Sequence, residues 1–353
     1  MSEKPKPPRD RRLDALKGYA IVCVVAYHAL GQYFTFTRGV VIYDASAIWL
    51  RAFLFSFMLP LFAFLSGFVL GRPDGFRPRD YFTKRTLGLL VPFVCWETIY
   101  GPSKHAEMLS SVRAFFAYYG HVVLNPHYEG RMWYLYILWI ALMLLGVFRL
   151  FGDRTWVILL SVPLVYWIGS HGQFTWLRWI YAYVAMGVLY RRYEAWFLPR
   201  LKWLGIVGAT AYVPLWLVSQ PEQFAHARAA RAITNPGLLG LANSALNYIP
   251  LLTGAAAVIA ILAASYHIPK WLEAGLAVLG TLSLGIYITH FPFVEMWFHM
   301  PLWFLPVNVA IAAVVAVGWT LVLGRFRVSA TLLLGEPWVH KPRQLGDVQT
   351  ETL

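Results

Sequence analysis

Long apolar runs separated by short polar segments dominate the chain. A basic, proline-rich start is followed by an apolar run over residues 13–34. About 20 apolar residues are enough for a helix to cross the hydrocarbon core of a bilayer, so this run is predicted to span a membrane. Further apolar segments of the same kind follow at residues 47–70, 86–101, 132–151, 155–170, 176–190, 203–219, 243–265, 277–298 and 303–324.

This pattern predicts an all-α fold, a polytopic membrane helical bundle of about ten transmembrane helices. Residues 1–12 are predicted to be a cytoplasmic basic tail, residues 13–324 the transmembrane domain, and residues 325–353 a cytoplasmic C-terminal tail. Composition agrees, because 59% of the residues are hydrophobic and 13% are charged. A soluble protein carries about 25% charged residues.

The charge balance predicts how the chain is oriented in the membrane. The formal net charge of +13 would suggest binding to nucleic acid if the protein were soluble. In a membrane protein it fits cytoplasmic loops and anionic lipid headgroups, so membrane lipids and no nucleic acid are expected as partners. An even number of spans places both termini in the cytoplasm and leaves about three times as many basic residues inside as outside. The predicted location is the inner (plasma) membrane, as a multi-pass protein.

Other features are less specific. The two cysteines, Cys23 and Cys95, lie in apolar runs, so neither a disulfide framework nor a metal site is expected. Residues 110–124 are amphipathic and aromatic, which predicts an interfacial helix on the outer face. Residues 220–242 form the longest polar outer loop, either a solvated connection or an approach for an external acceptor.

Two ionisable residues interrupt the first apolar run, Lys17 and His28. On an α-helix this spacing places both side chains on one face, about 16 Å apart along the axis. An ionisable group inside a membrane is costly, which favours a functional role for the pair. The alternative is that Lys17 extends to the headgroups and that His28 is satisfied by a neighbour.

Three further features are candidates for chemistry. A cation cluster precedes the third apolar segment, and it either sets the topology or binds an anionic donor through guanidinium and ammonium groups. Its members are Arg72, Arg77, Arg79, Lys84 and Arg85. Glu97 should face the bundle interior, where it either orients His28 or pairs with Arg51, and a purely structural pairing is an equal alternative. His290 is interpreted as a structural hydrogen-bonding residue in preference to a catalytic one.

Several of these stretches, in order, resemble the integral-membrane acyltransferase-3 family, whose members acylate sugars and glycolipids. The family carries Leu-Asp, then Arg or Lys, ten residues and His, and Leu13-Asp14, Lys17 and His28 match with the less common Lys. Similar matches are Pro60 to Gly67, Lys84-Arg85, Trp133 to Leu135 and Ser283 to His290. The chain departs from the family at Met58-Leu59, where His-Met is frequent, and at Gly88, where another Arg is common.

The resemblance implies an O-acyltransferase that moves an acyl group, acetyl from acetyl-CoA, to a hydroxyl of a cell-envelope carbohydrate or glycolipid. His28 would be the general base and Lys17, held by Asp14, would bind the donor. Arg77, Arg79, Lys84 and Arg85 would hold the donor phosphates, and Glu97 would support His28. An acyl-histidine step, the acceptor sugar, the acyl group and homo-oligomer formation stay open.

Two other classes compete with this interpretation. Polar residues within about ten spans would also suit a transporter or flippase for a polysaccharide or lipid-linked sugar. That class needs neither a histidine three turns from a cation nor a cation cluster at a donor face. A structural assembly partner is the third class, and it predicts neither acyl transfer nor transport.

Overall fold

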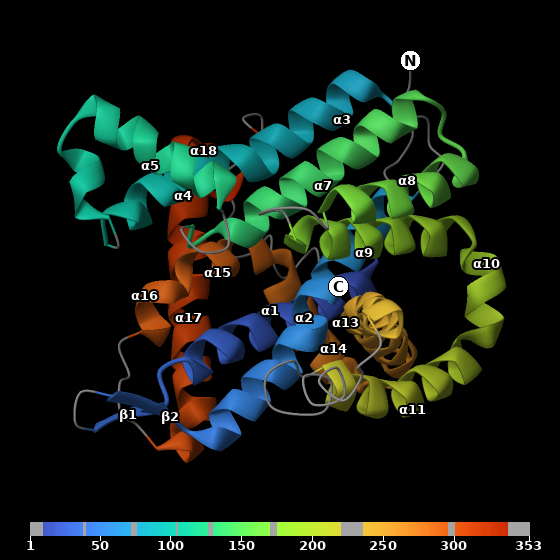
Figure 1. Ribbon diagram of the computed structural model, residues 1–353. Helices are drawn as coiled ribbons and strands as arrows, with labels where there is room; N and C mark the ends of the chain where they lie inside the picture. The colour runs from blue at the N-terminus through green and yellow to red at the C-terminus, as the bar shows by residue number, and fades with distance from the viewer. Residues whose placement is uncertain are drawn as a thin grey trace.

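The computed structural model describes residues 10–37, 40–71, 76–103, 105–125, 130–169, 175–219, 236–295 and 301–337. Their regular secondary structure is helical apart from one antiparallel hairpin, in which β1 (Phe34–Thr37) pairs with β2 (Val40–Tyr43). The expected helical bundle is confirmed (Figure 1). The first helix ends at Leu30 and not at residue 34, because Gly31 is followed by a β-branched and aromatic stretch that favours strands.

The first part of the chain forms α1 (Arg11–Leu30), α2 (Ala45–Leu70), α3 (Pro78–Arg85), a π-helical turn (Thr86–Leu90), α4 (Val91–Tyr100) and α5 (Val112–Leu124). Polar side chains cap three of these helices. Asp10 accepts from the Arg12 amide, Asp44 from the Ala47 amide and Ser111 from the Ala114 amide. Each cap satisfies an amide that has no partner within its helix, and so fixes where the helix begins.

The remaining elements are α7 (Trp133–Leu150), α8 (Thr155–Gly169), α9 (Thr175–Arg192), α10 (Glu194–Phe197), α11 (Leu201–Ser219), α13 (Pro236–Ala264), α14 (Lys270–Thr281), α15 (Ser283–Thr289), α16 (Phe291–Val294), α17 (Leu305–Gly324) and α18 (Arg327–Leu334). Trp96 of α4 donates to the Leu333 carbonyl at 2.9 Å, so α18 packs on the bundle although it lies within the tail predicted to begin at residue 325.

The expected count of about ten spans is not confirmed. Among the described residues, five helical segments are long and apolar enough to cross a membrane: Arg11–Leu30, Ala45–Leu70, Trp133–Leu150, Glu194–Ser219 and Leu302–Gly324. The pair α14 and α15 passes the same test together but is bent by 64°. Most other predicted segments coincide with helices that are short, such as α8 with 15 residues, or that carry several arginines, as α9 does. The predicted loop at residues 220–242 lies outside the described residues up to residue 235, and its last part belongs to α13.

Glycines allow two helix pairs to pack backbone against backbone. A Cβ on Gly18 of α1 would overlap the Leu276 carbonyl of α14, and one on Gly280 would overlap the Asp14 carbonyl. At the contact between α2 and α9, a Cβ on Gly67 would overlap the Val184 carbonyl. Small residues allow such close approach in a bilayer, where dispersion contacts replace the hydrophobic effect as the source of helix association.

The helices around α1 have a defined direction. Arg12 lies over the Tyr266 ring at 4.1 Å, just before α14, and the His28 ring lies 5.1 Å from that of His290, just after α15. The broken helix α14–α15 therefore runs in the same direction as α1. The helix α2 runs the opposite way, because Lys17 shares a pocket with Ser66 and the Tyr27 ring packs on Phe55.

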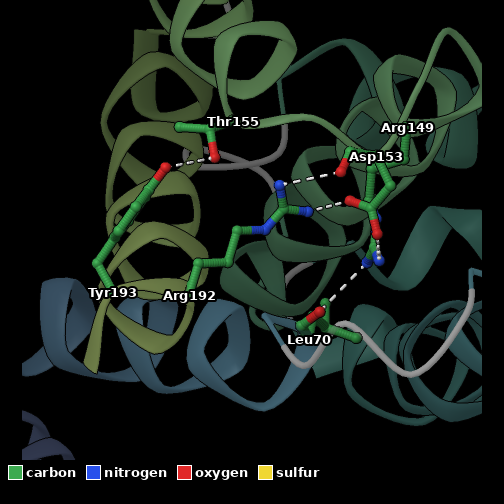
Figure 2. A network of polar contacts seen from close by, with 6 residues as sticks. All are labelled: Leu70, Arg149, Asp153, Thr155, Arg192 and Tyr193. Carbon is green, nitrogen blue, oxygen red and sulfur yellow. Dashed lines mark hydrogen bonds and ion pairs between the residues drawn. The ribbon is translucent and has the colours of Figure 1, made fainter. Parts of the chain in front are cut away.

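A polar network ties together the ends of three helices (Figure 2). Arg149 of α7 is 6% exposed and donates to Asp153 at 2.6 Å and to the Leu70 carbonyl of α2 at 3.2 Å. Arg192 of α9 pairs with the same carboxylate. A buried guanidinium needs such partners. Because Leu70 ends α2, the network lies at the same end of the bundle as Lys17.

Candidate active site

A pocket of about 270 Å³ adjoins Lys17 between the helices of the bundle. Its wall comes from α1, α2, the π-helical turn, α7 and the break between α14 and α15. The Lys17 side chain is 28% exposed and its ammonium lies 3.4 Å from Asp14, which is buried. The expected contact between Lys17 and Asp14 is therefore present, and it leaves Lys17 accessible from the pocket.

The break in the ninth predicted segment shapes this pocket. Gly280, Thr281, Ser283 and Leu284 all line it, on both sides of the 64° bend. The glycine packs directly on the α1 backbone, whereas the residues after the bend follow a different axis. A straight helix over residues 277–298, as the sequence predicted, would not produce this change of axis beside Lys17.

His28 and His290 meet at the other end of α1. Their ring centroids are 5.1 Å apart, and the Phe291 ring lies 4.6 Å from His28 and 4.3 Å from His290. His290 is fully buried and its Nδ1 lies 3.0 Å from the Ile286 carbonyl. The Tyr27 ring also packs against His28, with ring centroids 5.1 Å apart. The Arg51 guanidinium lies over the Tyr27 ring, 4.8 Å from its centroid. His28 therefore sits among rings, with a second imidazole beside it.

Two tyrosines lie between the pocket and the histidines. Tyr287 lines the pocket, and its ring is 6.2 Å from that of His290. Tyr134 lines the same pocket, lies 6.1 Å from Tyr287 and donates to the Leu59 carbonyl at 3.4 Å. The series Lys17, pocket, Tyr287, His290 and His28 thus connects the two ionisable residues of α1 through the bundle interior.

Glu97 is fully buried and accepts hydrogen bonds at the start of α7. The donors are the Tyr118 hydroxyl at 3.0 Å and the Met132 amide at 2.5 Å. These contacts give Glu97 a structural role that joins α4, α5 and α7, which was one of the alternatives from the sequence. Its predicted action on His28 stays a prediction.

An ion pair that the sequence did not reveal lies next to this junction. Arg131, just before α7, contacts Glu295, just after α16, at 2.6 Å, and its guanidinium lies 6.0 Å from the Phe291 ring. The two residues are 164 positions apart, and the sequence predicted Arg131 just before one span and Glu295 inside the span at residues 277–298. Only the fold brings them together, close to the ring that packs on both histidines.

The cation cluster lies on α3 and on the approach to it. Arg77, Arg79 and Lys84 are exposed, and Arg85 is half-buried with its guanidinium 6.0 Å from the Tyr81 ring. Arg72 lies outside the described residues. Tyr81 donates to the Leu142 carbonyl of α7 at 2.7 Å, and the turn that follows α3 brings Leu89 to the pocket wall. The cluster is therefore followed directly in the sequence by the turn that forms part of the pocket wall.

Together, the fold and site define a polytopic helical membrane protein whose ionisable groups gather along one helix, around one pocket. The chain belongs to acyltransferase family 3, because the family model, described as an acyltransferase domain, matches residues 10–334. This match confirms the family resemblance and covers the chain from the cap of α1 to the end of α18. No curated protein and no solved structure matches the chain significantly.

Proposed function

We propose that this membrane acyltransferase is an O-acyltransferase that moves acetyl from acetyl-CoA to a hydroxyl of a cell-envelope carbohydrate, such as an exopolysaccharide or a lipid-linked sugar. The observation that carries the proposal is the arrangement along α1. One helix presents a cation to a pocket and, beyond that pocket, a histidine in an aromatic surrounding. Family membership supports the acyl transfer, and the donor and the acceptor are parts of the proposal.

The pocket suits one part of such a donor. A volume of about 270 Å³, with walls that include Phe62, Leu65 and Leu135, suits the slim pantetheine arm and the acyl group. The nucleotide and its phosphates would lie outside, where Arg77, Arg79 and Lys84 are exposed. Guanidinium and ammonium groups are the usual protein partners of phosphate. Lys17 would then donate to a phosphate or to the thioester carbonyl.

His28 would act as the general base. A neutral imidazole removes the proton of the acceptor hydroxyl as that oxygen attacks the thioester carbon. When the carbon–sulfur bond breaks, the protonated imidazole returns a proton to the leaving thiolate, so that an ester and a free thiol are formed. Phe291 and Tyr27 around the ring would limit access of water, which would otherwise compete as the acceptor.

The proposal includes an orientation, with both termini in the cytoplasm and the Lys17 end of α1 on the cytoplasmic side. Its basis is the excess of basic residues in the predicted inner loops. Single cysteines at the exposed positions His121 and His267, in a background without Cys23 and Cys95, test it in whole cells. An impermeant maleimide should label position 121 and leave position 267 unlabelled, and the reverse result would overturn the orientation.

A direct assay tests the function. The purified protein in nanodiscs is mixed with acetyl-CoA and envelope glycan extract, and the free thiol is measured together with ester formation by mass spectrometry. Surface glycans of cells with and without the gene are compared in parallel. The proposal predicts thiol release that depends on the glycan and O-acetyl groups that depend on the gene. Absence of thioester cleavage, together with transbilayer movement of a lipid-linked sugar, would favour the transporter class.

A further inference from the structure

The two nitrogens of His290 have different surroundings. Nδ1 lies 3.0 Å from the Ile286 carbonyl oxygen, which can only accept, so Nδ1 carries the proton. In the neutral ring, Nε2 is then an acceptor. Nε2 is buried and has no hydrogen-bond partner among the described residues. The contact with Ile286 therefore fixes both the ring and its tautomer, and leaves one acceptor inside the protein.

A buried acceptor without a partner calls for an explanation. Leaving such a group unsatisfied costs about 1–3 kcal/mol, and most buried polar atoms in proteins are paired. A purely structural role for His290 needs only the Nδ1 hydrogen bond. The ring that lies 5.1 Å from His290, centroid to centroid, is the imidazole of His28, and Phe291 packs against both rings.

We propose that His290 is a positioning residue for the acyl transfer, and that its Nε2 accepts a hydrogen bond from the N–H of His28 in the reacting state. This proposal rests on the proposed function, in which His28 is the base. It assigns a role to His290 for which the sequence favoured a structural interpretation. Hydrogen bonds of this kind are often long in a free enzyme and shorten only when the substrate is bound.

The hydrogen-bonded series would run from the Ile286 carbonyl through His290 to His28 and on to the acceptor hydroxyl. Only one proton moves, from the hydroxyl to the free nitrogen of His28, and later from His28 to the thiolate. His290 keeps its own proton throughout and forms no covalent bond. Its contribution is to hold His28 with one nitrogen free and to stabilise the positive charge that His28 carries between the two transfers.

Two replacements by amide side chains distinguish the roles of the two ring nitrogens of His290. The amide of His290→Asn can replace Nδ1 as a donor to Ile286 but cannot reach the place of Nε2, whereas His290→Gln can place an oxygen near that atom. The expected result is that kcat for glycan-dependent thiol release falls about 10²-fold in His290→Asn and clearly less in His290→Gln. KM for acetyl-CoA should stay unchanged in both variants. His267→Asn, at an exposed histidine before α14, is the matched control and should keep the wild-type kcat.

The opposite ranking would overturn the proposal. If His290→Asn is as active as the wild type and His290→Gln is not, the residue serves only the Nδ1 contact. Equal losses in both variants, with wild-type thermal stability, would also contradict a role specific to Nε2. If the wild-type protein itself releases no thiol, the proposed function fails and the ranking of variants does not arise, so the two failures can be told apart.

A second measurement does not require the His290 variants to fold. The protein is labelled with ¹⁵N-histidine and compared with His28→Gln by solid-state NMR in lipid, with a non-hydrolysable thioether analogue of acetyl-CoA bound. The proposal predicts a protonated Nδ1 and an Nε2 whose chemical shift moves when His28 is replaced. An Nε2 shift that is insensitive to His28 would overturn it.

Discussion

The two ends of α1 have opposite surroundings. At Lys17 the side chain is 28% exposed, is paired with Asp14 and lies on a pocket of about 270 Å³. At His28 the neighbours are aromatic rings and a second, fully buried imidazole. One helix thus connects an accessible ionic end with an enclosed aromatic end.

This difference indicates how a membrane enzyme could handle two unlike tasks on one helix. A charged donor must keep contact with water and cations, because moving phosphates into the bilayer interior is prohibitive. Proton transfer benefits from a site with little water, where hydrogen bonds are stronger and hydrolysis is suppressed. If this division is correct, substitutions at the two ends should affect different kinetic constants.

The largest effect is expected at the enclosed end. His28→Ala should lower acyl transfer by about 10²–10⁴-fold, the usual contribution of a general base, while coenzyme A still binds because the pocket lies at the other end. Turnover by thiol release and binding by calorimetry in detergent check the two parts. His121→Ala, at an exposed position on α5, is the control. Near-normal turnover in His28→Ala would end the proposed mechanism.

A smaller effect should follow from pushing α1 and α14 apart. In Gly280→Ala the new Cβ would overlap the Asp14 main chain, and such overpacking costs about 1–3 kcal/mol of stability. We expect a lower unfolding temperature in detergent and a higher KM for acetyl-CoA, because the displaced backbone is next to Lys17. Gly275→Ala on the same helix is the matched control, since its Cβ would meet nothing within 4 Å. Equal stability of both variants would contradict the close crossing.

Much of this comparison could be predicted from sequence. Lys17 and His28 stand out because each interrupts an apolar run, and helical geometry alone places them on one face. The helices themselves follow from apolar runs and caps such as Asp44 and Ser111. The hairpin after α1 was missed because its two strands have only four residues each and lie almost entirely in the connection between two predicted spans.

The rest depends on contacts between distant segments. Arg131 meets Glu295, and Glu97 meets Met132, only after the helices pack, and a single sequence carries no signal for such pairs. The bend after Gly280 could have been suspected from the glycine, but its 64° angle could not. His290 was interpreted as structural because the sequence does not show that its ring faces His28.

At the accessible end, Lys17→Ala should mainly raise KM for acetyl-CoA, by about tenfold, because one hydrogen bond to a charged group contributes about 1.5–3 kcal/mol, partly offset by water in an open pocket. Lys17→Arg should keep most of the affinity, since a guanidinium also binds phosphate or carbonyl oxygen. Initial rates at varied donor concentration separate KM from kcat. A loss in kcat alone would mean that Lys17 acts in the chemistry and that the division between the two ends is wrong.

The smallest effect is expected on the exposed cation cluster, where water and salt screen each charge. Arg85→Ala should weaken coenzyme A binding a few-fold, and Lys84→Ala less, because Arg85 is half-buried against Tyr81 and held in place, whereas Lys84 is free to move. Titration calorimetry in detergent, at low and at high salt, measures coenzyme A binding by both variants. Salt screens charges that are in contact with solvent more than charges inside a pocket. The effect of Arg85→Ala should therefore shrink at high salt, while that of Lys17→Ala should persist. Binding that is unchanged in both cluster variants would limit the cluster to setting the topology, and the accessible end of the site would then consist of Lys17 and its pocket alone.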